Sequence, residues 1–187
     1  MTRYFAFLRA INVGGHLVKM DRLREIFESL GFANVETFIA SGNVIFESPS
    51  KNVKTLERKI ENGLREALGY EVRTFIRTEP ELVEVINCQP FRESDLATAL
   101  ALNIMFIGET LNEESNVALM ALRTDIDDLH VRGREIYWLC QKKQSESTIS
   151  NVAFSKAVGM PGTVRGLNTI KKLMAKYASS GDRRTKA

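Results

Sequence analysis

The sequence predicts an α+β protein made of two ferredoxin-like βαββαβ units, an internal duplication joined by a short helix and followed by a C-terminal helix. Strand-like and helix-like runs alternate in the order βαββαβ between residues 2 and 78. The same order returns after residue 101. Each repeat also contains two strand-like runs joined by a short turn with glycine, which is typical of a hairpin.

The first ferredoxin-like half is expected at residues 1–78. An almost wholly apolar run at 2–11 predicts a first strand that is covered on both faces. Apolar residues at helical spacing predict helices at 20–30 and 53–68. The other strands of this half are expected at 35–40, 44–47 and 71–78.

Residues 79–100 are expected to form a helical connector, with one short helix at 79–86. The second half is expected at 101–187, ending in a C-terminal helix and a basic tail. Its strands are expected at 102–107, 129–132, 135–140 and 163–165, and its helices at 112–122, 147–158 and 168–177. The two hairpins align Gly42-Asn43-Val44-Ile45-Phe46 with Gly133-Arg134-Glu135-Ile136-Tyr137.

Helices cover one face of each sheet in this topology, and we expect strands one and three to run parallel. Because the first strand is apolar on both faces, the open face is expected to be buried, most simply against the other half. The seam between the halves would then be a natural place for a ligand.

Composition excludes several classes of protein. The chain is 44% hydrophobic and 26% charged, as globular proteins are, and has no apolar run long enough for a membrane span. A cytoplasmic location is expected because the amino terminus lacks a signal-peptide pattern. Cys88 and Cys140 stand far apart without zinc-ligand spacing, so both are expected to be reduced core residues and no metal is expected.

The net charge of +3 is concentrated at the carboxyl end. The tail at 179–187 holds three basic residues against one acidic residue, which leaves the rest of the chain near +1. That charge is weak for a protein that binds nucleic acid through phosphates. We expect the tail to be disordered.

Two candidate features follow the first strand. Arg9 shares the predicted strand face with Phe5, Phe7 and Ile11, and an unpaired cation there is costly. It is expected either to bind a carboxylate or phosphate or to form an internal salt bridge. Asn12 and the pair Gly14 and Gly15 lie between strand and helix, where backbone amides attract anions, although the glycines also suit loop geometry alone.

Other polar residues give weaker signals. Ser41 and Asn43 could present polar groups beside that loop, but they are also good turn formers. Neither His16 nor His130 belongs to a catalytic or metal-binding signature. Arg165 and Asn168 flank a predicted helix start, where an anion is favoured, whereas Lys171 and Lys172 suit a solvated helix face.

Four segments are distinctive together: Leu8 to Gly15, Ser41 to Phe46, Gly133 to Trp138, and Thr163 to Arg165 with Asn168-Thr169. With these segments the chain resembles the bacterial family catalogued as domain of unknown function 1697. The resemblance implies a duplicated ferredoxin-like fold and brings no established activity. This chain has Arg165-Gly166-Leu167-Asn168 where the family tends to have Arg-Asn-Trp-Asn, and Ala10 where glycine is usual.

The leading hypothesis is that the protein binds, or acts as an enzyme on, a small anionic or phosphate-bearing ligand at the seam. The expected ligand-binding residues are Arg9, Asn12, Gly14, Gly15, Ser41, Asn43, Arg165 and Asn168. No catalytic residue, cofactor or oligomeric state is predicted. One alternative is a nucleic-acid-binding module that uses the Lys171-Lys172 helix and the tail, and another is a protein-interaction scaffold without a ligand.

Overall fold

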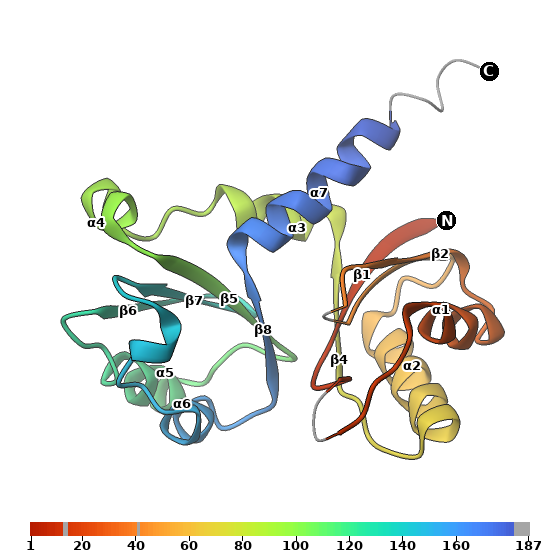
Figure 1. The fold of residues 1–187 in the computed structure, drawn as a ribbon, viewed down its shortest axis with the longest axis horizontal. Coiled ribbons are helices and arrows are strands. Elements are labelled where there is room, and N and C mark those ends of the chain that lie inside the picture. The colour runs from red at the N-terminus through yellow and green to blue at the C-terminus, as the bar shows by residue number, and fades with distance from the viewer. Residues whose placement is uncertain (13–14, 41, 182–187) are drawn as a thin grey trace. The chain divides into compact units, whose positions relative to one another are not determined.

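The computed structural model describes residues 1–12, 15–40 and 42–181. The chain divides into two compact units, Met1–Leu82 and Val83–Ala187. Each unit holds a four-stranded antiparallel sheet with helices on one face (Figure 1). The predicted α+β fold with two ferredoxin-like units is therefore confirmed.

In the first unit the sheet has the order β2-β3-β1-β4. Its helices α1 and α2 lie on one face of this sheet (Figure 1). Alternate strand residues such as Ala6, Leu8 and Phe46 join Phe27 and Ile60 of the helices in one apolar core. The elements are β1 (Thr2–Leu8), α1 (Met20–Ser29), β2 (Ala33–Phe38), β3 (Asn43–Ser48), α2 (Val53–Leu68) and β4 (Thr74–Thr78).

The direction of strands one and three differs from the prediction. β1 pairs with β3 antiparallel, and also with β4 antiparallel. Each helix crosses over one intervening strand, so the strands that it connects run in the same direction without being neighbours.

The second unit repeats this sheet with the order β6-β7-β5-β8. Its helices α5 and α6 cover one face, where Trp138 stacks on Phe154 with ring centroids 5.2 Å apart. α6 starts four residues later than predicted, because Ser150 caps it by accepting a hydrogen bond from the Ala153 amide. The elements are β5 (Ala101–Ile107), α5 (Glu113–Met120), β6 (Asp127–Arg132), β7 (Glu135–Cys140), α6 (Asn151–Val158), β8 (Gly162–Gly166) and α7 (Leu167–Gly181), with a short 3₁₀ turn at Gln144–Glu146.

The predicted alignment of the two hairpins is wrong by one residue. Ile45 pairs with Phe5 of β1, and Tyr137 pairs with Ile104 of β5. Ile45 therefore corresponds to Tyr137 rather than to Ile136. A slip of one residue moves a side chain to the opposite face of the sheet, so this correction decides which side chains face the helices.

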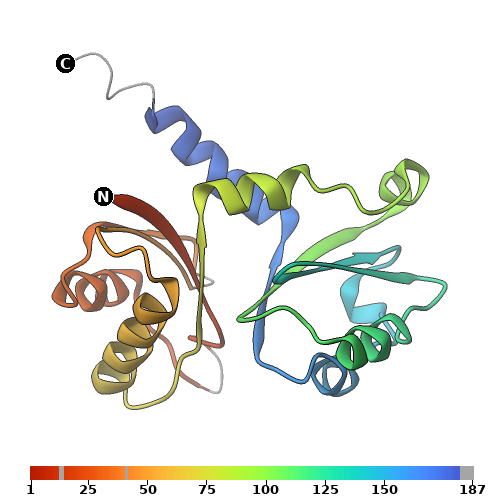
Figure 2. The ribbon, with the colours of Figure 1, turned by 180° about the vertical axis from the view of Figure 1, so that it is seen from behind.

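In each unit the last strand runs directly into a helix (Figure 2). β4 leads into α3 (Glu79–Asn87), and β8 leads into α7. A second connector helix, α4 (Glu93–Thr98), was not predicted. In the second unit the Tyr137 hydroxyl donates a hydrogen bond of 3.4 Å to the Val85 carbonyl of α3. The end of α3 thus lies on the sheet face opposite to α5 and α6.

Candidate functional site

The loop after β1 and the first hairpin turn lie together at one end of the first unit. The Asn12 side chain donates to the Ala40 carbonyl at 3.0 Å and accepts from the Val18 amide at 2.8 Å. Gly42 has a φ of 71°, and a Cβ there would lie 2.8 Å from the Ile11 side chain. The structure therefore brings two of the predicted segments together, and Asn12 already has protein partners there.

Arg9 is not part of the first strand. β1 ends at Leu8, three residues before the predicted end, and the Arg9 side chain is exposed. The expectation of a charge set among apolar neighbours is therefore wrong, because the chain turns at Ala10, whose φ is 56°. The Arg9 amide still continues the ladder by donating to the Arg73 carbonyl at 2.8 Å.

The other predicted residues of the first unit have different environments. Asn43 is buried at the start of β3, and its side chain closes the hairpin by donating to the Phe38 carbonyl at 3.0 Å. Gly15 is exposed with a φ of 85°, which glycine adopts easily. Gly14 and Ser41 lie outside the described residues. Whether this group meets Arg165 and Asn168 stays a prediction.

Arg165 lies in β8, just before α7, and is only 8% exposed. Its Nη1 donates 2.8 Å hydrogen bonds to the Thr163 hydroxyl and the Val164 carbonyl. Burial lowers the pKa of Arg165 to about 10. Arg77 occupies the matching place in β4, is fully buried, and donates from Nη1 to the carbonyl of the preceding residue at 2.8 Å.

The sequence reasoning missed Arg77, although a signal for it was present. Arg77 pairs with Phe5 as Arg165 pairs with Ile104, so the two arginines occupy equivalent positions. In both units the arginine is the penultimate residue of the strand that leads into a helix. Aligning the two units from this end would have found it.

Asn168 borders a cavity of about 310 Å³ in the second unit. Its floor is the sheet face away from α5 and α6, where Leu102 and Leu139 pair across β5 and β7. The first turns of α7 form one wall, the end of α3 another, and α4 with the residues after it a third. The lining residues are Ile86, Cys88, Gln89, Pro90, Leu96, Ala99, Leu100, Ala101, Leu102, Leu139, Leu167, Asn168 and Lys171.

The cavity is lined mostly by apolar residues and has one positive charge. Lys171 is the sole Lys, Arg, Asp or Glu among the described residues that line it. Lys171 and Asn168 are three residues apart in α7, so they share one helix face, and both are exposed. Neither side chain forms a hydrogen bond or ion pair with another described residue. Both are therefore available to a bound molecule.

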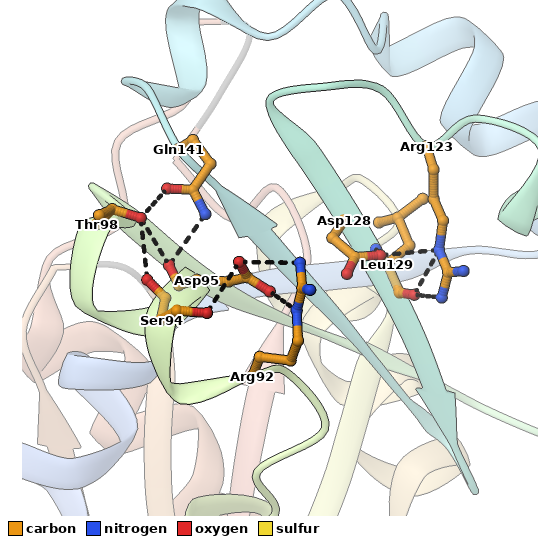
Figure 3. Close-up of polar contacts among 8 residues, drawn as sticks. All are labelled: Arg92, Ser94, Asp95, Thr98, Arg123, Asp128, Leu129 and Gln141. Atoms are coloured by element: carbon orange, nitrogen blue, oxygen red, sulfur yellow. Dashed lines mark hydrogen bonds and ion pairs between the residues drawn. The ribbon is translucent and has the colours of Figure 1, made fainter.

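A polar cluster holds α4 in place at the edge of this cavity (Figure 3). The Gln141 amide donates to the Asp95 carbonyl at 3.0 Å, and the Thr98 hydroxyl donates to Gln141 Oε1 at 2.8 Å. Arg92 forms a two-pronged ion pair with the Asp95 carboxylate, 2.8 Å at its shortest. Because α4 carries Leu96, these contacts position one wall of the cavity.

The same close-up shows a second arginine that is also paired (Figure 3). Arg123 donates to the Leu129 carbonyl at 3.1 Å and forms a 2.8 Å ion pair with Asp128. With Arg92 and Asp95 it lines a smaller cavity of about 210 Å³, which also contains Asp125. Since each arginine faces a carboxylate, this cavity does not favour an anion.

The remaining chemistry-bearing groups have structural roles. The Asp127 carboxylate is buried and accepts from Trp138 Nε1 at 2.7 Å and from the Ser147 and Thr124 hydroxyls. Both cysteines are free, but Cys88 is half-buried rather than a core residue. Over residues 1–12, 15–40 and 42–181 no group of three acidic, histidine or cysteine side chains has the geometry to hold a metal ion.

Comparison with models of protein families shows which family the chain belongs to. The family model described as "protein of unknown function (DUF1697)" matches residues 1–137. The chain belongs to this family. The DUF1697 chain is also similar to a solved structure, that of the conserved bacterial protein SP0830 from Streptococcus pneumoniae, with a TM-score of 0.74 and 23% identity. The alignment covers 94% of this chain and 98% of that one, which supports the fold.

No curated protein matches the DUF1697 chain significantly. No described helix is long and apolar enough to cross a membrane.

The sequence does not predict the cavity, because most of its lining lies outside the candidate motifs. Residues 79–100 are expected only to form a helical connector, and Lys171 suits a solvated helix face. Asn168 is the one predicted site residue among the described residues that line the cavity. The hydrophobic connector residue Leu100 is 66% exposed, yet periodicity does not reveal such exposure before the fold is known.

Proposed function

We propose that the second unit binds a small organic anion in the 310 Å³ cavity. The observation that carries this proposal is the lining itself, which consists mostly of apolar residues and has Lys171 as the one charged side chain among the described residues. Ligand cavities are mostly apolar with a few polar groups that orient the ligand, and they span ~300 to 1,000 Å³. A ligand of modest size is therefore favoured, with its charged end at Lys171 and its apolar part over Leu102 and Leu139.

Two further features support an anion at this place. Asn168 offers an amide donor on the same face of α7 as Lys171. The first turn of α7 contains no acidic residue. No side chain of that turn therefore neutralises the positive end of the helix dipole, which favours a bound anion.

A thermal-stability screen with small anions tests the proposal. An anion present at a hundred times its Kd adds about 2.7 kcal/mol to the free energy of unfolding, which raises the Tm. Lys171→Gln should remove most of the shift, because a hydrogen bond to a charged group is worth about 1.5 to 3 kcal/mol.

Lys172→Gln is the matched control, because Lys172 is the adjacent exposed lysine of α7 and does not line the cavity. It removes the same charge from the helix and should keep the shift. Equal responses of the two variants, or no stabilising anion in a broad screen, would contradict the proposal.

A further inference from the structure

We infer that the ligand is a monocarboxylate with a short apolar body, such as a branched or straight acyl chain or a single ring, rather than a phosphate ester. This inference rests on the proposed function and narrows its ligand class. It follows from the charge, the donors and the size of the cavity.

The charge of the cavity matches a single negative charge. A phosphate monoester carries about −1.5 to −2 at pH 7. Lys171 is the one charged group among the described lining residues, so a phosphate would keep about one negative charge that no lining side chain compensates. A carboxylate is neutralised by the one lysine.

The donors also favour a carboxylate. Planar arginine forks bind phosphate well, but no arginine lines the cavity in the part of the chain that the structure describes. Arg165, two residues before α7, is occupied by the Thr163 hydroxyl and the Val164 carbonyl. Lys171 and Asn168, three residues apart on one helix face, offer one donor group to each carboxylate oxygen.

The size and lining limit the apolar body. The volume of about 310 Å³ lies at the small end of the range for ligand cavities. Leu102 and Leu139 form its floor, and Leu100 at its edge is 66% exposed, so a bound chain would cover an apolar side chain that now faces water. Each added methylene should tighten binding about fourfold until the cavity is full.

The test is calorimetric titration of the full chain with butanoate, hexanoate, octanoate, hexanamide and hexyl phosphate. We expect affinity to rise along the carboxylates, and hexanamide to bind at least tenfold more weakly than hexanoate because it has no charge for Lys171. Hexyl phosphate should bind more weakly than hexanoate. Hexanamide that binds as tightly as hexanoate would overturn the inference.

Cys88 provides an independent readout of where the probe binds. It lines the cavity and is half-buried, whereas Cys140 is fully buried, so the two thiols serve as probe and internal control. Hexanoate should slow alkylation of Cys88 by iodoacetamide in the wild type and in Lys172→Gln, and should have little effect in Lys171→Gln.

A second pair of variants tests the apolar body. Leu100→Asp places a charge at the cavity edge and should weaken hexanoate binding tenfold or more. Val117→Asp is its control, because Val117 is 63% exposed on α5 and does not line the cavity.

The outcomes separate the inference from the proposed function. If hexyl phosphate binds more tightly than hexanoate, protects Cys88 and depends on Lys171, the anion site stands and the carboxylate inference fails. If no probe protects Cys88 and none depends on Lys171, both fail.

Discussion

Removal of the Asp127 carboxylate tests whether one buried group holds the edge of the second sheet together. Asp127 is 1% exposed and accepts hydrogen bonds from three side chains, of which Trp138 Nε1 is the closest at 2.7 Å. The Ser147 hydroxyl donates at 2.9 Å and the Thr124 hydroxyl at 3.1 Å. The carboxylate thereby joins β6, β7 and the segment before α6.

The expected cost of Asp127→Ala follows from these contacts. A hydrogen bond to a charged group contributes about 1.5 to 3 kcal/mol, and a buried donor that loses its acceptor adds a desolvation penalty. Because the three bonds share one carboxylate, they are not additive, and we expect a loss of about 3 to 5 kcal/mol in the free energy of unfolding. Such a loss is a large part of the stability of a small domain.

A double-mutant cycle isolates the Trp138 bond. Trp138→Phe removes the donor while keeping an aromatic ring against Phe154. Urea unfolding followed by circular dichroism would give the four free energies, and we expect a coupling energy of about 1.5 to 3 kcal/mol between the two sites. A coupling below ~0.5 kcal/mol would refute the reasoning, because additivity within that error is what independent sites show.

Three further perturbations probe other parts of the structure. Gly162→Ala would place a Cβ 2.9 Å from the Phe106 carbonyl oxygen and should lower the free energy of unfolding in urea by about 1 to 3 kcal/mol. Gly108 has open space around it, so Gly108→Ala should change that free energy by less than ~0.5 kcal/mol. Burial, and after it the Arg123 charge, lowers the pKa of His130 below 6.5. Because the unfolded chain then binds the proton more readily than the folded one, the free energy of unfolding should fall as the pH drops below 6.5. His130→Gln should flatten that dependence in urea titrations from pH 5 to 7.5, and an unchanged slope would contradict the assignment. Gln141→Ala removes the hydrogen bonds of Gln141 with Thr98 and with the Asp95 carbonyl, which hold α4. Binding of hexanoate should therefore weaken several-fold, while the far-UV circular dichroism spectrum stays the same. Unchanged affinity would show that α4 needs no such anchor.

Strong local signals allowed much of the fold to be predicted from sequence. α2 spans the predicted 53–68, because Asn52 caps its start and Gly69 adopts the left-handed conformation at its end. Weak signals produced the errors. The first strand was extended through Arg9 because apolar character does not show where a strand leaves its sheet, and the backbone turns at Ala10 instead.

The candidate site was harder to predict than the fold because its residues are distant in sequence. Asn168 was singled out for its place near a helix start, and it does border the cavity. Leu102 and Leu139 become neighbours only when β5 and β7, which are distant in sequence, pair in the sheet. A cavity is a property of packing, so its lining appears only when the elements are placed.

A comparison of the two units supports the proposed anion site in the second unit. Both units have a buried arginine one residue before the end of the last strand, followed by a helix. The first turn of α3 carries Glu79 and Glu81, and the Glu81 carboxylate accepts from the Thr78 amide at 2.7 Å, so this helix start is already capped by an anion of the protein. The first turn of α7 has no acidic residue, and Asn168 and Lys171 face the cavity beside it. The same backbone plan therefore supplies its own carboxylate in the first unit, whereas in the second unit the proposed ligand would bring one.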